Sequence, residues 1–178
     1  KGVLLPLQYP TPNVYTVGQT ITDLVPTLTA AADSFSITPS LPNGLSFDTA
    51  TGIISGTPTA LQSATDYEVT ATNSGGTTSF TLSIAVIDVA PTLLSYTTPN
   101  VFTIDEAITN LQPTVSGENL TFSISPSLPN GLSFDTATGI ISGTPTVLQS
   151  ATDYEVTATN SGGSTSFTLS IEIIDVAP

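Results

Sequence analysis

The sequence contains no cysteine and no histidine. Without cysteine, the chain has no disulfide bond, no thiol nucleophile and no thiolate ligand for a metal. Without histidine, it lacks the usual general base near neutral pH and the most common transition-metal ligand. Serine and threonine are abundant, but a Ser-His-Asp arrangement is excluded because no base accompanies them. We therefore expect no catalytic machinery in this chain.

Positive charge is almost absent as well. Lys and Arg together number 1 and Asp and Glu 14, which gives a formal net charge of −13. Nucleic-acid binding is excluded, because phosphate backbones need Lys or Arg side chains to neutralise them. Docking on anionic lipid is disfavoured for the same reason. The sole lysine is Lys1, which excludes a Lys–Asn isopeptide cross-link of the kind that needs a buried lysine. The acidity either keeps the protein soluble or supplies oxygen ligands for a divalent cation.

Long apolar runs are missing too. No run approaches the roughly 20 residues that span a membrane, so we expect no membrane insertion. Hydrophobic residues nevertheless make up 39% of the chain and the mean hydropathy is +0.28, which is enough for a packed core. The start, Lys1-Gly2-Val3, has none of the features of a signal peptide. We expect the sequence to begin inside a longer protein.

What the chain does contain is a repeat. Shifted by 87 residues, it aligns with itself without a gap, and residues 39–58 recur unchanged as residues 126–145. The sequence Ile87-Asp88-Val89-Ala90-Pro91 closes the first copy and recurs in the second. These observations predict two modules, residues 1–90 and 91–178, joined by almost no linker.

Within each repeat, hydrophobic residues alternate with polar ones. In Ser79–Val86 the Phe, Leu, Ile and Val side chains share one face, and Asp66–Thr72 shows the same period. An alternation of period two with many β-branched residues indicates β-strands. Asn73-Ser74-Gly75-Gly76 lies between the two runs and predicts a hairpin turn, because glycine supplies the positive φ that such a turn needs.

Seven short strands per repeat follow from this pattern, separated by turn signals. In the first repeat they are expected near Tyr15–Val17, Ile21–Leu24, Phe35–Ile37, Leu45–Phe47, Ile54, Tyr67–Ala71 and Phe80–Val86. The predicted fold class is all-β, with one antiparallel β-sandwich in each module. A module of this size buries about two-thirds of its unfolded surface, which is enough to fold without disulfides.

Two runs in each repeat carry a resemblance. Leu41-Pro42-Asn43-Gly44-Leu45-Ser46-Phe47-Asp48 is followed by Thr51-Gly52-Ile53-Ile54-Ser55-Gly56-Thr57-Pro58. Together with Tyr67–Gly76, these runs resemble the bacterial "putative immunoglobulin-like domain" family, which is related to dystroglycan-type cadherin-like modules. The resemblance covers nearly all of both repeats. It implies two tandem seven-stranded antiparallel Greek-key sandwiches of the immunoglobulin and cadherin type, used as building blocks of surface and secreted proteins and lacking shared catalytic residues.

The residues of this motif also have a structural explanation. Phe47 and its twin Phe134 are expected to be buried in the two cores. Asp48 is expected to hold the following turn through Thr51, because an Asp side chain accepts hydrogen bonds from nearby backbone amides. Gly52 allows a backbone conformation that a Cβ would block. The motif therefore predicts a fold rather than a binding site.

Few residues are candidates for catalysis or ligand binding. Asp66 and Glu68 form a carboxylate pair on one strand face, but an open sheet offers no pocket that would raise one pKa for acid catalysis. Tyr9 and Tyr96 do not fit the inward phase of the strands, and we treat them as candidates for exposed aromatic residues that contact a sugar. Asn119-Leu120-Thr121 matches a glycosylation sequon, but its twin does not, and chance is the better explanation.

Carboxylates predict calcium sites at the ends of the modules. Four are expected near the junction of the two modules, namely Asp66, Asp88, Glu118 and Asp135. Four more are expected at the C-terminal end of the second module, namely Asp105, Glu106, Asp153 and Asp175. Residues 87–91 also look like the calcium-ligating linker ending of cadherins, although the Asp-x-Asp pair of cadherins is absent.

These observations predict a non-catalytic structural or adhesive tandem segment of a surface or secreted bacterial protein. It would act outside the cell as a stalk or spacer, and its partners would be the neighbouring modules of a longer chain. Two alternatives stay open: a module that binds a glycan or a host protein through loops at one end, and an accessory domain of a secreted hydrolase.

Overall fold

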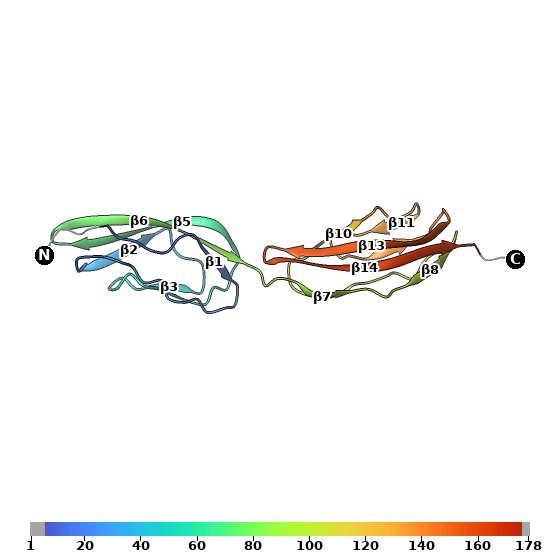
Figure 1. The fold of residues 1–178 in the computed structure, drawn as a ribbon. Coiled ribbons are helices and arrows are strands. Elements are labelled where there is room, and N and C mark those ends of the chain that lie inside the picture. Colours follow the sequence, from blue (N-terminus) through green and yellow to red (C-terminus); the bar gives the residue numbers. More distant parts are fainter. Residues whose placement is uncertain (1–5, 176–178) are drawn as a thin grey trace. The chain divides into compact units, whose positions relative to one another are not determined.

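The computed structural model of the chain describes residues 6–175, and these form strands, turns and loops (Figure 1). The chain divides into two compact units, residues 1–87 and 88–178. The boundary expected after residue 90 therefore lies inside the second unit. The described part of the chain has no helix that is long and apolar enough to cross a membrane.

Each unit has its own set of strands. In the first unit they are β1 (Asn13–Thr16), β2 (Ser34–Thr38), β3 (Leu45–Phe47), β4 (Ile54–Gly56), β5 (Gln62–Asn73) and β6 (Gly76–Ile87). In the second they are β7 (Thr92–Ser95), β8 (Asn100–Thr103), β9 (Thr114–Ser116), β10 (Thr121–Ser125), β11 (Leu132–Phe134), β12 (Ile141–Gly143), β13 (Gln149–Asn160) and β14 (Gly163–Ile174).

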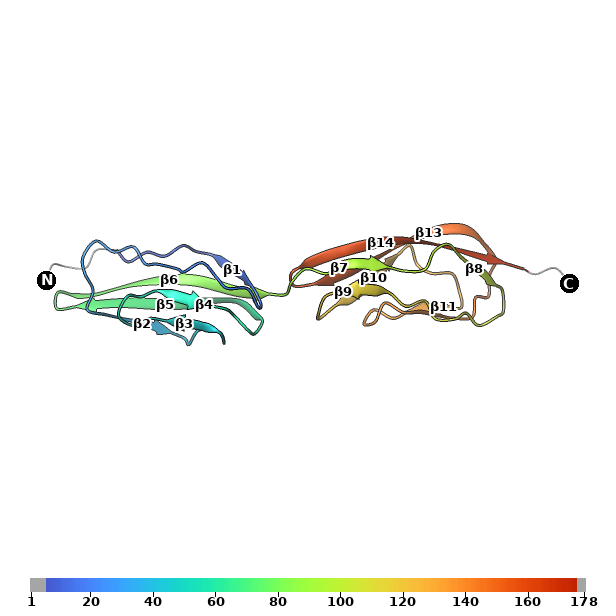
Figure 2. The same cartoon turned by 90° about the horizontal axis from the view of Figure 1, so that it is seen from below.

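The strands of each unit form two layers. One layer is a four-stranded sheet, with the order β1-β6-β5-β2 in the first unit and β8-β14-β13-β10 in the second. In Figure 2 the strands β1, β6, β5 and β2 follow one another across the sheet of the first unit. The opposite layer of this unit, which lies below β5 and β6 in Figure 1, contains the β3–β4 hairpin, extended by the bridges Leu24↔Ile54 and Gln8↔Thr27. In the second unit β11–β12, the bridge Leu111↔Ile141 and β7–β9 make the same layer. The predicted all-β sandwich is confirmed in both units.

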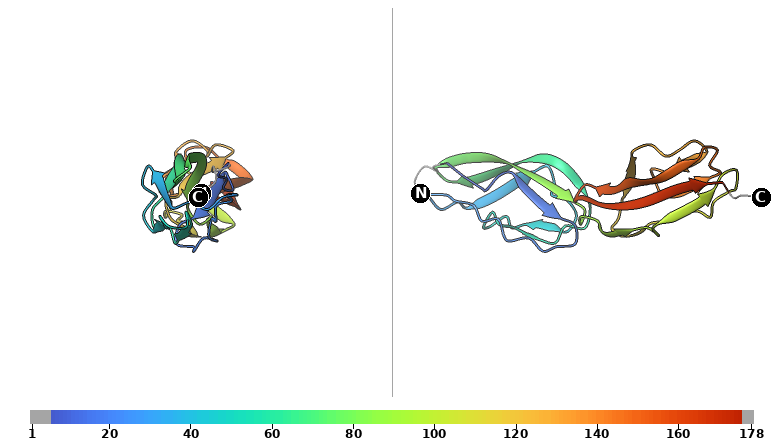
Figure 3. Two further views of the ribbon diagram at one scale, coloured as in Figure 1. Left: turned by 90° about the vertical axis from the view of Figure 1, so that its left-hand side faces the viewer. Right: turned by 45° about the vertical axis from the view of Figure 1, so that its right-hand side comes forward.

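The pairing of the first strand differs from the antiparallel arrangement that the sequence predicts. β1 runs parallel to β6, with Asn13 opposite Ile84 and Thr16 opposite Ile87, and β8 pairs in the same way with β14 (Figure 3). The chain starts in the opposite layer at Gln8 and crosses to the larger sheet before Asn13. Pro10 and Pro12 lie in the crossing segment, and proline has no amide hydrogen with which to continue the antiparallel ladder.

The expected strand near residues 21–24 is reduced to isolated contacts. The amide of Ile21 donates to the Gly56 carbonyl and the amide of Leu24 to the Ile54 carbonyl, each at 2.9 Å. These bonds hold the segment beside β4 without a continuous ladder, so the first unit has fewer regular strands than predicted.

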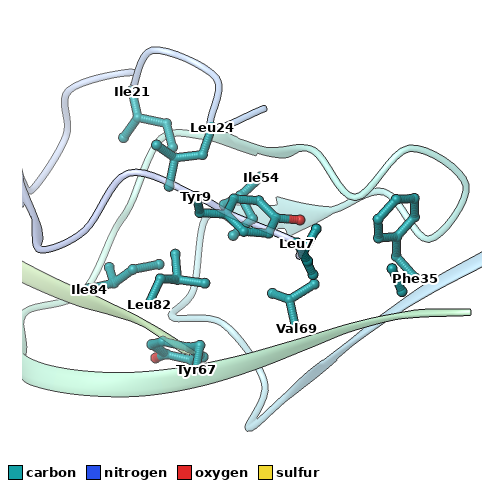
Figure 4. Close-up of a cluster of buried hydrophobic side chains, with 11 residues drawn as sticks. Leu7, Tyr9, Ile21, Leu24, Phe35, Ile54, Tyr67, Val69, Leu82 and Ile84 are labelled. Atoms are coloured by element: carbon teal, nitrogen blue, oxygen red, sulfur yellow. The ribbon is translucent and has the colours of Figure 1, made fainter. Parts of the chain in front are cut away.

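The core lies between the layers and follows the predicted alternation (Figure 4). Leu82, Ile84 and Val86 of β6 are buried, as are Tyr67 and Val69 of β5. The core of the first unit also contains Leu7, Tyr9, Ile21, Leu24, Phe35, Ile54 and Ala71. That of the second unit consists of Leu94, Tyr96, Phe122, Ile141, Tyr154, Val156, Ala158, Leu169, Ile171 and Ile173.

Phe47 and Phe134 are only half-buried, so the prediction that both are buried was wrong. Each lies on a short hairpin strand at the margin of its core, β3 or β11, where it packs against the core on one side. The other side of each ring faces the solvent at the edge of the sandwich.

Tyr9 and Tyr96 are buried, so the expectation that they are exposed was also wrong. Tyr9 is 6% exposed, and its hydroxyl donates to the Gly52 carbonyl at 2.5 Å. The centre of the Tyr9 ring lies 6.2 Å from the centre of the Phe80 ring. Tyr96 is 7% exposed and donates to Gly139 at 2.6 Å. A buried hydroxyl needs such a partner, because an unpaired one costs desolvation energy.

The glycines of the family motif allow backbone segments to meet closely. A Cβ on Gly44 would collide with the carbonyl oxygen of Thr57, and one on Gly56 would collide with the Gly44 carbonyl oxygen. Both glycines also have positive φ angles, +91° and +122°. The amide of Thr57 then donates to the Gly44 carbonyl at 2.9 Å. The motif is thus explained by the packing of the β3–β4 hairpin.

Asp48 holds the turn within this motif, as predicted. Its Oδ1 accepts the amides of Ala50 at 2.8 Å and Thr51 at 3.3 Å. These bonds, chiefly the one from Ala50, lower the pKa of Asp48 from its ordinary value because they favour the charged carboxylate. Asp135 accepts the equivalent bonds from Ala137 and Thr138 in the second unit, and its pKa is lowered for the same reason.

The packing predicts that two adjacent substitutions on β6 differ strongly. Phe80→Ala should lower the free energy of unfolding by about 3 kcal/mol, because it opens a cavity beside Tyr9. Thr81 is exposed on the opposite face, so Thr81→Ala should cost less than about 0.5 kcal/mol. Urea titration of both variants measures the difference. Equal losses would contradict the observed strand phase.

Candidate functional site

The acidic pair on β5 lies on an open sheet face. Asp66 stands opposite Ser83 and Glu68 opposite Thr81, and both carboxylates are exposed. Asp66 was expected at the end of the module, but β5 begins at Gln62, which places Asp66 inside the strand. Its twin Asp153 lies inside β13 in the same way. Neither aspartate is therefore positioned at an end loop.

The other acidic residues of the calcium prediction are spread over the second unit. Asp105 and Glu106 lie in the turn after β8, Glu118 follows β9, and Asp175 follows β14; all four are exposed. The carboxylate of Asp135 is engaged in its own turn. Within residues 6–175 no three acidic side chains lie close enough together to hold a metal ion.

Asp88 is different from the other carboxylates, because it is almost fully buried in the second unit. The residue is 5% exposed. Its Oδ1 accepts the side-chain amide of Asn119 at 2.9 Å, and its Oδ2 accepts the hydroxyl of Ser161 at 2.7 Å. Its own backbone amide donates to the Ser161 Oγ at 2.8 Å. These bonds, that from Asn119 first, lower the pKa of Asp88.

The backbone beside Asp88 is also held by the second unit. The side-chain amide of Asn160 donates to the carbonyl oxygens of Val89 at 2.8 Å and Glu118 at 3.0 Å. Gly162 lies so close that a Cβ there would collide with the Asp88 carbonyl. These contacts explain why the second unit begins at Asp88 rather than after residue 90.

The role of Asn119 was missed by the sequence reasoning, which considered this residue only as part of a sequon. Its backbone is in the left-handed region, with φ +53°, which Asn tolerates better than most residues. Its side-chain amide is already used on Asp88. A signal was present in the sequence: the first repeat has Ala32 at the position of Asn119 and Lys1 at the position of Asp88.

Each unit has a shallow groove at the edge between its two layers. The first has a volume of about 490 Å³ and is lined by Ser36, Ile37, Ser40, Leu41, Leu45, Phe47 and Thr49. The second, of about 410 Å³, is lined by the identical residues of the other repeat. Phe47 and Phe134, which are half-buried, line these two grooves.

Aromatic side chains are largely taken up by the two cores. The chain has 5 Tyr and 7 Phe, and each of them is buried or half-buried. Sugar rings bind on exposed aromatic faces through their apolar C–H groups. Among the aromatic residues, the half-buried Phe47 and Phe134 line the grooves. Tyr9 and Tyr96, the candidates from the sequence, serve the core instead.

Curated relatives of this chain are bacterial adhesins. A protein described as "Serine-rich adhesin for platelets" from Staphylococcus aureus strain MRSA252 is 32% identical over 162 residues, which cover 88% of this chain and 12% of the adhesin. The protein of the same description from strain N315 is 34% identical over 136 residues, 75% of this chain and 6% of the adhesin. The chain thus spans a small part of the length of these relatives.

Solved structures with a similar fold include immunoglobulin domains 1–4 of Sidekick-1, with a TM-score of 0.53 at 12% identity, covering 98% of this chain and 50% of the other. Extracellular domains 3–5 of Drosophila OTK superpose with a TM-score of 0.53 at 15% identity, covering 97% of this chain and 63% of the other. Titin domains A168–A170 give a TM-score of 0.53 at 19% identity, covering 95% of this chain and 65% of the other. At such identities the likeness shows the fold alone.

The sequence profile of the family described as "Putative Ig domain" matches residues 6–87 and again residues 84–173. The two matches correspond to the two units and together cover nearly all of the chain. The chain therefore belongs to the "Putative Ig domain" family, with one such domain in each unit.

Proposed function

We propose that this chain is a non-catalytic segment of a bacterial surface or secreted adhesive protein, in which it bears tension and separates other parts. Membership of the family and similarity to staphylococcal adhesins support this assignment. The matched stretch is 12% of the adhesin from strain MRSA252. That share suits one segment among many.

The observation that carries the proposal is the parallel pairing of the first and last strands of each domain. Tension on the chain enters the first unit on the N-terminal side of β1 and leaves at the C-terminal end of β6. Because the two strands are parallel neighbours, this tension loads all of their hydrogen bonds in shear at once. The same geometry recurs at β8 and β14. Sheared bonds break together, whereas bonds at a peeled edge break one at a time.

The ladder extends one residue beyond the regular strands. The amide of Val17 donates to the Ile87 carbonyl at 2.9 Å, and the amide of Ile104 donates to Ile174 at the same distance. In each unit the bond therefore lies at the last residue of the sheared strand, next to the point where tension leaves the domain. Such placement favours resistance to pulling.

The chemistry of the carboxylates supports a non-catalytic role. The pKa values of Asp48, Asp88 and Asp135 are lowered by hydrogen bonds, whereas a general acid near neutral pH needs a raised pKa. Asp66 and Glu68 lie exposed on a sheet face. The lowered pKa values make Asp48, Asp88 and Asp135 poor general acids near neutral pH.

Force spectroscopy on the chain tests the shear geometry. Two unfolding events are expected, one for each unit. Val17→Pro removes the amide that bonds to Ile87 and should lower the force of one event, while the other stays unchanged as an internal reference. Val14→Pro is the matched control. Because backbone amides alternate in direction along a strand, the amide of residue 14 lies on the outer side of the edge strand β1, away from β6. The Val14 side chain is also exposed.

The unfolding forces of the two variants decide whether the β1–β6 bonds bear the tension. Both variants should first be checked by circular dichroism, so that only folded chains are pulled. Unchanged forces in the Val17→Pro chain, or equal losses in the two variants, would show that the β1–β6 bonds do not bear the tension.

Ligand binding is the second candidate function, and the paired grooves are the observation in its favour. The stalk assignment predicts that beads coated with the chain retain no more platelets than beads coated with the Ser40→Arg/Ser127→Arg variant. Both serines are exposed at the grooves, and arginine would obstruct them. Greater retention by the original chain would favour the binding assignment instead.

Calcium binding stays a prediction. An ion bound to the folded state would stabilise it by mass action, so the melting midpoint should rise with millimolar calcium and return with a chelator. The cluster expected at Asp105, Glu106, Asp153 and Asp175 is tested by repeating the melt with Asp105→Asn, which should reduce the rise. A midpoint that is insensitive to calcium would contradict the prediction.

A further inference from the structure

The sequence Ile-Asp-Val-Ala-Pro occurs at residues 87–91 and again at residues 174–178. Its two aspartates have different surroundings. Asp88 is 5% exposed and forms part of the second unit. Asp175 follows β14 and is exposed. Because the local sequence is identical, the difference comes from what the rest of the fold brings to each aspartate.

Asp88 is buried because residues further along the second unit supply two hydrogen-bond donors. The side-chain amide of Asn119 and the hydroxyl of Ser161 each donate to one carboxylate oxygen, at 2.9 and 2.7 Å. Hydrogen bonds to a charged carboxylate are stronger than those between neutral groups. Both oxygens are thus used by the chain itself.

The acid and the amide form a matched pair in the sequence. The second unit has both Asp88 and Asn119, whereas the first repeat has Lys1 and Ala32 at the two positions. The serine is common to both repeats, since Ser74 is the twin of the serine that bonds Asp88. Of the two groups that donate to the Asp88 carboxylate, the amide is therefore the one that distinguishes the second unit from the first repeat.

We propose that Ile-Asp-Val-Ala-Pro is a joint sequence, whose aspartate is bound by an Asn and a Ser of the module that follows it. Asp175 is then the acid of a second joint, and its partner is a further module of this family with Asn and Ser at the positions of Asn119 and Ser161. A module resembling the first unit, with Ala32, would supply only the hydroxyl. The inference goes beyond the proposed function, because it concerns which module can follow this one and not the load that the array bears.

The chain as it stands tests the existing joint. Asp88→Ala and Asn119→Ala should each lower the melting midpoint of the second unit by several degrees. Together they should lower it by clearly less than the sum of the single effects, because the partners share one interaction. Glu155→Ala, at an exposed carboxylate of the same unit to which no role is assigned, is the matched control and should change little. Additive losses would overturn the pairing.

An extended chain tests the second joint. Residues 175–178 repeat residues 88–91, so a second copy of residues 92–178 attached after Pro178 creates a third module that begins at the joint sequence. Asp175→Ala should lower the midpoint of the third module by several degrees in the extended chain, and leave the original chain unchanged. Replacing the third module's copy of Asn119 by Ala should remove most of this effect.

Each outcome decides the matter. Equal changes of the melting midpoint on Asp175→Ala in the original and extended chains would overturn the proposal. It would also be overturned if Asp175→Ala still lowered the midpoint of a third module whose copy of Asn119 had been replaced by Ala. Asp175→Ala could prevent the third module from folding. In that case Asp175→Asn, which keeps one acceptor oxygen, should let the module fold with a smaller drop in its melting midpoint. A third module that stays unfolded in the Asp175→Asn chain would count against the joint. These melts involve no applied force, so their failure is separate from a failure of the stalk assignment.

Discussion

The buried face of the β5–β6 hairpin is the feature on which the rest of the first unit depends, and β13–β14 has the same role in the second. Leu82 of β6 lies opposite Tyr67 of β5, and Phe80 lies opposite Val69. Along β6 the buried Leu82 and Ile84 alternate with more exposed residues. Burying such side chains stabilises the fold by about 25 cal/mol for each Å² of apolar surface. A shift of one residue would turn every one of them toward water, so the register is fixed. β1 and β2 then attach to the two outer edges of this hairpin, and the opposite layer packs on its buried face.

The second layer depends on close backbone contacts rather than on large side chains. Gly44 and Gly56 let the β3–β4 hairpin approach its neighbouring backbone, and Tyr9 fastens the first segment to Gly52 through its hydroxyl. Gly44, Gly52 and Gly56 belong to the family motif, and these glycines and Tyr9 all stabilise the fold. The outer faces of both units are therefore free to be Ser- and Thr-rich.

The two proposals made for this chain both concern the ends of the domains. The parallel pairing of β1 with β6 connects the entry and the exit of the first unit through one ladder of bonds. At the entry of the second unit, Asp88 is bound by Asn119 and Ser161. A strong ladder within each domain and a fixed entry segment are both properties that a load-bearing array needs. Neither requires a pocket.

The sequence by itself determined the repeat, the all-β class, the strand phase of β5 and β6, and the turn at Asp48, because each depends on local periodicity or on contacts within a few residues. Tertiary structure decided the parallel pairing of β1, the burial of Tyr9 and the partners of Asp88. Tyr9 and Gly52 lie 43 residues apart, and Asp88 and Ser161 lie 73 apart. It also placed Asp66 inside a strand and kept the carboxylates of the second unit apart. No local pattern encodes such distances, because which side chains meet depends on how the layers pack.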